Sequence, residues 1–189
     1  MSHESPPTRR WTRIEYERMV EREIFRPDDR IELVDGHLFV KEPPHPSHAT
    51  TVQLVAEALR GAFGAGWTVR TGLPLGLDDV SEPEPDVAVV RGSPRDYAAD
   101  HPSQPVLVVE VSHSRLRFDR TRKRQLYARN GVPEYWIVDV NGRVLQVFRE
   151  PGGAGRSATY RSVAILGPDA FATPLAASST ASHVSDLLP

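Results

Sequence analysis

The chain contains short runs of valine, leucine and isoleucine that end at proline, glycine or charged residues. Three such runs lie in the middle of the sequence, at residues 85–90, 105–112 and 133–139. Runs of this length and composition are typical of buried β-strands. A polar segment with helical character, residues 115–130, separates the second run from the third. Strands interrupted by a helix predict an α/β fold with a mixed sheet at its centre.

The N-terminal part of the chain predicts a helix and then a hairpin. Thr12, followed by Glu15 three residues later, has the pattern of a capping box and predicts a helix over about residues 13–23. Asp35-Gly36 joins two strand-like runs, and this dipeptide is a strong signal for a two-residue hairpin turn. We therefore expect strands at residues 31–34 and 37–41.

The remaining pattern predicts one long helix and further strands. Ser47 is expected to cap a helix that runs to about Phe63, with valine, alanine and leucine at helical spacing facing the sheet. Asn141-Gly142 predicts a second two-residue hairpin, whose return strand covers residues 143–148. Additional strands are expected at residues 67–75 and 157–164.

Composition places the chain among globular proteins with one main domain. Its 189 residues are 39% hydrophobic and 25% charged, which is enough for one core and too few for two comfortable domains. We expect a disordered tail at residues 1–10 and a single domain over residues 11–166. Residues 167–189, rich in alanine, serine and threonine, are expected to form a loosely packed extension.

Charge and residue usage exclude several kinds of site. Because the net charge is −2, any affinity for nucleic acid must come from a local basic surface. The chain has no cysteine, which excludes disulfides and thiolate zinc sites. It also has no apolar run long enough to span a bilayer and no signal-peptide pattern. We therefore expect a cytoplasmic protein without a membrane partner.

Two acidic residues occupy matching places in the central runs. Asp86 opens one predicted strand and Glu110 nearly closes the next. If these strands pair antiparallel, the start of one lies beside the end of the other, and one register puts both side chains on the same face. Two close carboxylates repel each other, and a hard divalent cation compensates them well. The alternative is that each acid caps a strand end or pairs with an arginine.

The segment after Glu110 is strongly basic. Arg120, Lys123, Tyr127 and Asn130 share one face of the predicted helix, which is expected to begin near Phe118 or Asp119 and to end at Asn130-Gly131. The segment is either a solvated charged face or a basic patch that binds the phosphate groups of a nucleic acid. The candidates for nucleic-acid binding are Arg115, Arg117, Arg120 and Arg124.

These features follow one another in an order that resembles one protein family. The order is Pro85-Asp86, then Glu110-Val111-Ser112, then Asp119-Arg120 with Lys123 and Tyr127, then residues 131–136. It resembles the Uma family, mostly bacterial proteins classed as candidate restriction endonucleases in the PD-(D/E)XK nuclease superfamily. The resemblance implies a restriction-endonuclease-like mixed sheet core flanked by helices, with an N-terminal helix and hairpin. It also implies a metal-dependent endonuclease that hydrolyses phosphodiester bonds in DNA and that pairs as a homodimer.

The resemblance gives roles to individual residues. Asp86 and Glu110 would hold Mg²⁺ or Mn²⁺, with the carbonyl of Val111 as a further ligand, and Lys123 would be the catalytic lysine. The superfamily pattern places that lysine two residues after the glutamate, where this chain has Ser112. Lys123 can take the role only if its helix points back at the sheet edge. The possible rim of the site comprises Glu32, His48, Glu84, Ser112 and Tyr127.

Two other readings of the chain stay open at this point. One is a non-catalytic nucleic-acid-binding or regulatory domain that retains the nuclease fold. The other is a metal-dependent hydrolase of smaller phosphoesters. For single residues too, an alternative to a role in the site is open. Glu32 is then an exposed strand residue, and His48 is a surface or capping residue.

Overall fold

The computed structural model describes residues 8–26 and 28–189. Residues 1–7 of the predicted tail, and Pro27 of a turn expected at Pro27-Asp28-Asp29, lie outside the described residues. None of the helices in the described part of the chain is both long and apolar enough to cross a membrane.

A six-stranded sheet forms the centre of the molecule, with the strand order β3-β4-β5-β6-β7-β8. The strands are β3 (Trp67–Thr71), β4 (Val87–Arg91), β5 (Leu107–Ser112), β6 (Glu134–Asp139), β7 (Val144–Gly152) and β8 (Thr159–Leu166). Strands β5 and β6 are parallel, and all other neighbours in this sheet are antiparallel. The predicted mixed α/β sheet is therefore confirmed.

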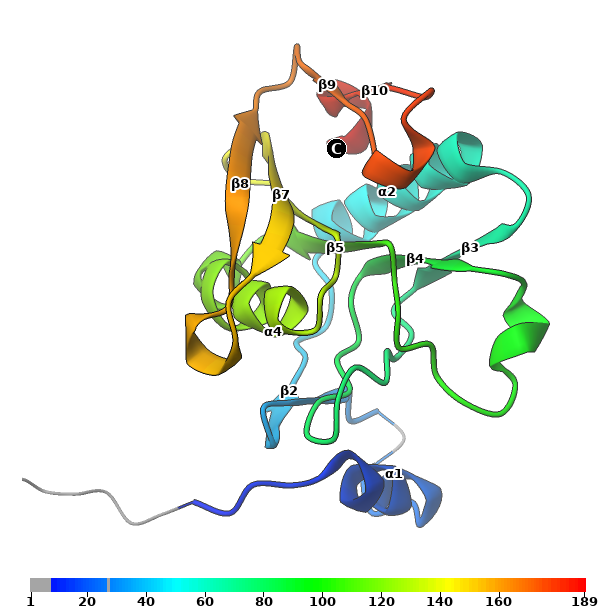
Figure 1. Cartoon of the computed structure of the whole chain (residues 1–189), viewed down its shortest axis with the longest axis vertical. Helices are drawn as coiled ribbons and strands as arrows, with labels where there is room; N and C mark the ends of the chain where they lie inside the picture. The colour runs from blue at the N-terminus through cyan, green and yellow to red at the C-terminus, as the bar shows by residue number, and fades with distance from the viewer. Residues whose placement is uncertain (1–7, 27) are drawn as a thin grey trace, which may run out of the picture.

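Helices cover both faces of this sheet. Helix α2 (Pro46–Phe63) lies on one face, and the helical segment formed by α3 (Leu116–Phe118), η2 (Asp119–Lys123) and α4 (Arg124–Arg129) lies on the other (Figure 1). Alternate strand residues point to opposite faces, so Val87 and Val109 join the core under α2, whereas Ala88 and Val108 join the core under α4. The predicted positions of the apolar residues of α2 are also confirmed, since Val55, Ala56 and Leu59 are buried.

The N-terminal elements follow their local sequence signals. Helix α1 (Arg13–Glu21) has the predicted capping box between Thr12 and Glu15. Strands β1 (Ile31–Val34) and β2 (His37–Val40) form the predicted hairpin, in which Asp35 and Gly36 have φ values of 53° and 74°. Two consecutive positive φ values are those of a type I′ turn, which matches the twist of the paired strands.

Several predicted boundaries were wrong. Helix α2 begins at Pro46 with His45 as its N-cap, not Ser47, because the fixed φ of proline suits the first helical position. Strand β3 ends at Thr71, before Gly72, which has a φ of 57°. The β6–β7 ladder ends at the pair Asp139–Val144, and the positive φ falls on Arg143, so the connection is not the two-residue Asn141-Gly142 turn.

The helical segment after β5 starts earlier than predicted and is irregular. It begins at Leu116, and its five residues Asp119–Lys123 are π-helical. Its end agrees with the prediction, since Asn130 is the C-cap and Gly131 has a φ of 69°. A π-helical turn is wider than an α-helical turn and is often found at functional sites.

The C-terminal residues do not form the loose extension expected from their composition. They contain β9 (Phe171–Ala172), η4 (Leu175–Ala177), β10 (Ser182–His183) and η5 (Val184–Leu187). Val184 and Leu187 are buried in the same core cluster as α2. The apolar residues that anchor this segment come after the stretch rich in alanine and serine, so composition alone did not reveal them. The shorter 3₁₀ turns elsewhere are η1 (Pro94–Tyr97) and η3 (Gly155–Ser157).

Candidate functional site

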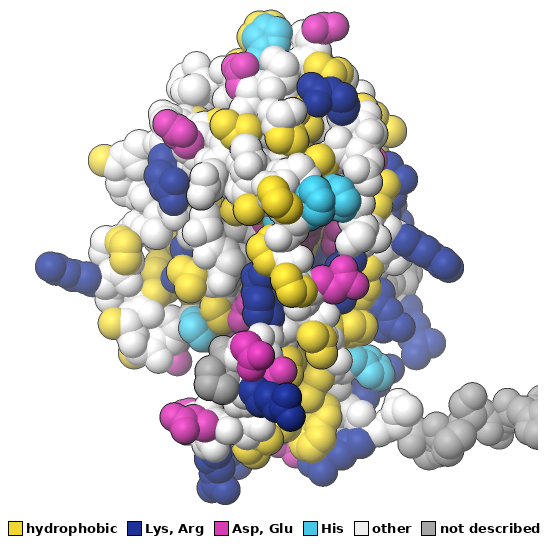
Figure 2. Space-filling view, turned by 180° about the vertical axis from the view of Figure 1, so that it is seen from behind, with side chains coloured by type: hydrophobic (Ala, Val, Ile, Leu, Met, Phe, Trp, Pro, Cys, Tyr) yellow, Lys and Arg dark blue, Asp and Glu magenta, His cyan; other side chains and the backbone are white. Residues whose placement is uncertain are grey.

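A cavity of about 500 Å³ opens where β4 begins and β5 ends. Its walls come from the β1–β2 hairpin, the start of α2 and the helical segment after β5. Asp86, Glu110, Val111 and Lys123, the predicted catalytic and metal-binding residues, all line it. The face turned away from the viewer in Figure 1 carries acidic, basic and histidine side chains near its middle (Figure 2).

Asp86 lies one residue before the start of β4. The antiparallel register pairs Val87 with Val109, so Asp86 and Glu110 are the next positions along the same two strands. The Asp86 Oδ2 atom accepts a hydrogen bond of 2.8 Å from the backbone N–H of Val111 and lies 3.1 Å from His48 Nε2. Burial alone would raise the pKa of Asp86, but His48 and the charge of Lys41 outweigh it and lower the pKa below its ordinary value.

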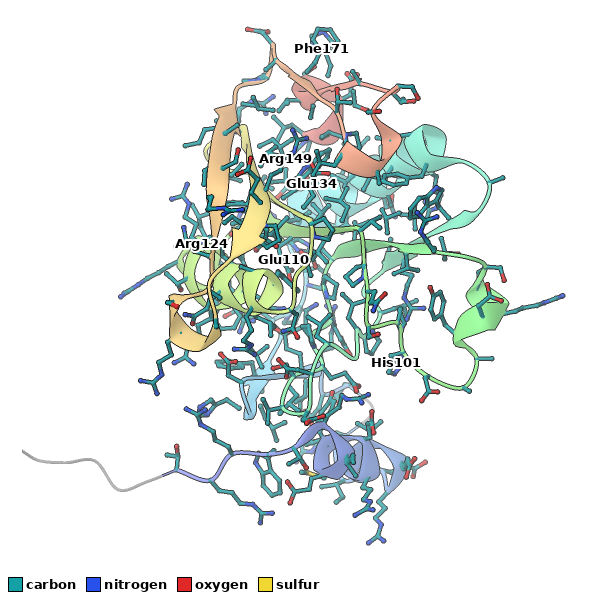
Figure 3. All side chains as sticks on the ribbon, in the orientation of Figure 1. His101, Glu110, Arg124, Glu134, Arg149 and Phe171 are labelled. Atoms are coloured by element: carbon teal, nitrogen blue, oxygen red, sulfur yellow. The ribbon has the colours of Figure 1, made fainter. Side chains whose placement is uncertain are left out.

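Glu110 is buried beneath the helical segment, with 7% of its side chain exposed. Its Oε1 atom accepts a hydrogen bond of 2.7 Å from the Tyr127 hydroxyl and lies 3.1 Å from Lys123 Nζ. Burial raises the pKa of Glu110, and the ammonium of Lys123 partly opposes this rise. In Figure 3 Glu110 lies in the interior of the molecule, between the sheet and α4.

Lys123 points back at the sheet edge, as its predicted role requires. Its Nζ atom lies 2.5 Å from Glu32 Oε2 and 3.1 Å from Glu110 Oε1, and its side chain is only 3% exposed. Burial would lower the pKa of Lys123, but the carboxylates of Glu110 and Glu32 outweigh it and raise the pKa. Glu32, expected at the rim, is therefore a buried partner of the lysine. Tyr127 lies beside them, with its ring centroid 5.9 Å from Lys123 Nζ.

Lys41 and Asp119 are among the residues of this cavity that were not predicted to belong to the site. Lys41 Nζ donates a hydrogen bond of 2.6 Å to the Glu84 carbonyl and lies 4.0 Å from Asp86 Oδ1. Asp119 is buried, and this burial, together with the charge of Glu110, raises its pKa to about 8. Asp119 precedes Lys123 by four residues, and such helical spacing was a signal that could have identified it.

The other predicted rim residues lie close to the acids. His48 contacts Asp86 through Nε2, and its Nδ1 atom is buried without a hydrogen-bond partner among the described residues. The hydroxyl of Ser112 is also buried and has no hydrogen-bond partner within residues 8–26 and 28–189. The backbone N–H of Glu84 donates to Glu32 Oε2 over 3.1 Å, and burial raises the pKa of the Glu84 side chain.

The structure separates the four arginines proposed to bind nucleic acid. Arg115 lines the cavity and donates a hydrogen bond of 2.7 Å to the Val40 carbonyl. Arg120 donates to Gln146 on β7, and Arg124 lies over the ring of Phe148. Arg117 is exposed on the surface of the helix. Of the four, Arg115 is the one that lines the cavity.

The oxygen atoms around this cavity suit a small, hard cation. Within residues 8–26 and 28–189, no group of three or more histidine, aspartate and glutamate side chains is placed to hold a metal ion. Magnesium, however, usually binds one or two carboxylates and keeps several of its waters. Asp86, Glu110 and Val111 line one cavity, and carboxylate and carbonyl oxygens are donors of the type that Mg²⁺ and Mn²⁺ prefer.

The mixed sheet, with two acids on adjacent strand positions and a lysine returned from the next helix, defines a nuclease-like α/β domain. Residues 14–180 match the model of the Uma2 family, described as "Putative restriction endonuclease", and the chain belongs to this family. The fold is similar to that of a solved structure from Anabaena variabilis ATCC 29413, described as "a putative nuclease belonging to DUF820". The TM-score is 0.64 at 18% sequence identity, over 83% of this chain and 88% of that chain. No curated protein matches the chain.

Proposed function

We propose that this protein is a magnesium-dependent endonuclease that hydrolyses phosphodiester bonds in DNA. The observation that carries the proposal is that Asp86, Glu110 and Lys123 line one cavity. Asp86 directly precedes β4, Glu110 lies on the adjacent strand β5, and Lys123 lies in the helical segment that follows β5. The family to which the chain belongs supports the same class of reaction.

The proposed roles follow from the charges and contacts of these residues. Asp86 and Glu110 would hold Mg²⁺ or Mn²⁺ with the carbonyl of Val111, and such an ion lowers the pKa of a bound water and polarises a phosphate. Lys123 supplies a fixed positive charge next to Glu110 and would stabilise negative charge that develops on the phosphoryl oxygens. Tyr127 holds Glu110 in place through its hydroxyl. Arg115 and Lys41 add positive charge to the cavity that the phosphate enters.

The test is magnesium-dependent nicking of plasmid DNA. The wild-type protein should cut, Asp86→Asn should be inactive, and Lys123→Ala should cut about a hundredfold more slowly, the scale of losing one donor to the transition state. Arg124→Ala is the matched control, because Arg124 is the next residue and lies over Phe148, outside the cavity. If Lys123→Ala cuts at the wild-type rate while Asp86→Asn is inactive, the lysine has no catalytic role, but the proposed role of Asp86 stands.

A binding domain without catalysis is the second candidate, and one observation favours it. Lys123 is held in two ion pairs with Glu32 and Glu110, so its charge is already balanced inside the protein. A wild-type protein that binds DNA or RNA but cuts neither, with magnesium or manganese, would support this candidate over the nuclease.

Homodimer formation is part of the proposal, because cutting both strands of a duplex usually uses two active sites and two-fold dimers are the commonest oligomers. Strand β8 lies at one edge of the sheet and exposes Val163 and Ile165, which offers a surface for pairing. Sedimentation should show a dimer at micromolar concentration, and a monomer at all concentrations would reject this part of the proposal.

A further inference from the structure

A second cavity, of about 600 Å³, lies on the other side of Asp86. We call it the α2 groove, because residues of α2 from Ala49 to Arg60 form one wall and Thr71 and Gly72 at the end of β3 form the other. Asp86 and His48 line both the α2 groove and the candidate site. The α2 groove and the candidate site therefore adjoin each other at Asp86 and His48.

One face of α2 supplies the groove with a regular series of side chains. Ala49, Val52, Gln53, Ala56 and Arg60 recur at spacings of three and four residues, which places them in one row along the helix. At 1.5 Å per residue, this row is about 17 Å long. Ala49, Gln53 and Arg60 are its exposed members, Val52 is half-buried and Ala56 is buried, so the row presents a small apolar surface beside an amide group.

The chemistry of the groove suits a nucleobase. The exposed Ala49 and the half-buried Val52 offer an apolar surface to the face of a base, while the Gln53 amide and the Thr71 hydroxyl can form hydrogen bonds with its edge. Arg30 and Arg60 also line the groove and can contact the sugar-phosphate chain, while Glu57 adds one negative charge beside them. The volume falls within the range of sites that enclose a small organic ligand.

We infer that the α2 groove binds an unpaired nucleobase adjacent to the phosphate at Asp86. This inference rests on the proposed function, since it adds a substrate preference to the same site. A base within a duplex exposes only its edges in the grooves, so its face can lie on Ala49 and Val52 only after it has left the stack. The substrate is therefore single-stranded or locally opened nucleic acid.

The test blocks the groove without touching the acids. Ala49→Trp introduces a large side chain at an exposed groove position, and Thr50→Trp, at the next exposed helical position, which does not line the groove, is the matched control. Each variant is assayed on a single-stranded oligonucleotide and on bis(p-nitrophenyl) phosphate, a small diester that has no base. We expect Ala49→Trp to lower kcat/KM at least tenfold for the oligonucleotide and to leave the small diester unchanged. Thr50→Trp should affect neither.

Binding measurements separate this inference from the proposed function. Fluorescence anisotropy without divalent metal gives the Kd of each protein for the oligonucleotide and for the same oligonucleotide made abasic. We expect Ala49→Trp and removal of the base each to weaken binding roughly tenfold. Ala49→Trp should weaken binding of the abasic oligonucleotide little further. A wild-type protein that cuts neither substrate but shows this binding pattern would reject the proposed function and retain the groove. Equal behaviour of Ala49→Trp and Thr50→Trp on the oligonucleotide, or no effect of removing the base, would overturn the inference.

Discussion

At the scale of single residues, Lys123 has a structural task as well as its proposed catalytic one. Its ammonium is the shared partner of Glu32 and Glu110, which lie on different strands and are both buried. Removing one partner of a buried ion pair leaves the other charge uncompensated, which costs about 3–5 kcal/mol. A loss of activity in a Lys123 variant must therefore be separated from a loss of folding.

We predict that Lys123→Ala lowers the free energy of unfolding by about 3 kcal/mol, because two buried carboxylates lose their counter-charge. Urea denaturation followed by circular dichroism measures this. The double variant Glu32→Gln with Lys123→Met should regain much of the stability, since it removes a charge of each sign. If the single and double variants are equally unstable, the ion pairs do not account for the loss.

Glu82 should make stability depend on pH. Its side chain is buried, and this burial, together with the charge of Glu17, raises its pKa from 4.5 to about 7. A carboxyl whose pKa rises on folding stabilises the fold below its unfolded pKa, and this stability is lost as pH rises from about 4.5 to about 7. We predict that Glu82→Gln stabilises the protein at pH 8 by about 2 kcal/mol and flattens the pH profile over this interval.

Thermal unfolding between pH 5 and pH 8 checks the prediction for Glu82. Glu150→Gln is the control, because the side chain of Glu150 is 63% exposed. If Glu82→Gln still loses stability steeply between pH 5 and pH 7, the pH dependence comes from another titrating group.

At the scale of elements, a buried carboxylate joins the sheet to the C-terminal segment. Glu134 at the start of β6 accepts hydrogen bonds from the Trp136 indole, from Arg149 on β7 and from the backbone N–H of Leu175. Arg149 also donates to the carbonyl of Thr173. In Figure 3 Glu134 and Arg149 lie next to each other beneath the C-terminal segment.

Arg149→Met should therefore destabilise the protein by about 2 kcal/mol, because Glu134 loses its counter-charge and Thr173 loses a donor. The melting temperature should fall by several degrees. Arg161→Met, which breaks an ion pair whose arginine side chain is 72% exposed, should change it little. Similar shifts in both variants would contradict a special role for the buried pair.

The sequence predicted the elements whose signals are local and missed those that depend on distant parts of the chain. The Asp35-Gly36 turn and the Thr12 capping box are set by neighbouring residues, so they were predictable. The π-helical turn at Asp119–Lys123 has no local signature, and it was not predicted. In the site, the alternation of strand residues indicated that Asp86 and Glu110 could share one side. The ion pair between Glu32 and Lys123 joins residues 91 positions apart, which no local pattern specifies.

At the scale of the whole molecule, the C-terminal segment completes the core on the α2 side of the sheet. Val184, Leu187 and Leu188 belong to the same buried cluster as Val55 and Leu59. Fully burying one such side chain contributes about 1.5–3 kcal/mol, so this short segment makes a large contribution to a single domain.

Val184→Asp should abolish cooperative unfolding or lower the free energy of unfolding by at least about 3 kcal/mol, because it places a charge in this core. Phe171→Asp is the matched control, since Phe171 lies in the same segment and is 60% exposed. Near-native stability of Val184→Asp in a urea titration would show that the segment can detach without disturbing the rest of the fold.

The π-helical turn at Asp119–Lys123 affects how this chain must be aligned with its relatives. Such a turn holds an extra residue, so it is equivalent to a one-residue insertion in an otherwise regular helix. The insertion rotates the residues after it by about 100° relative to those before it. An alignment that disfavours a gap at this point will pair Lys123 with a residue of different orientation in a relative whose helix is regular. The equivalent lysine in such a relative is found by superposing the carboxylates of the two proteins, not by counting residues from the end of β5.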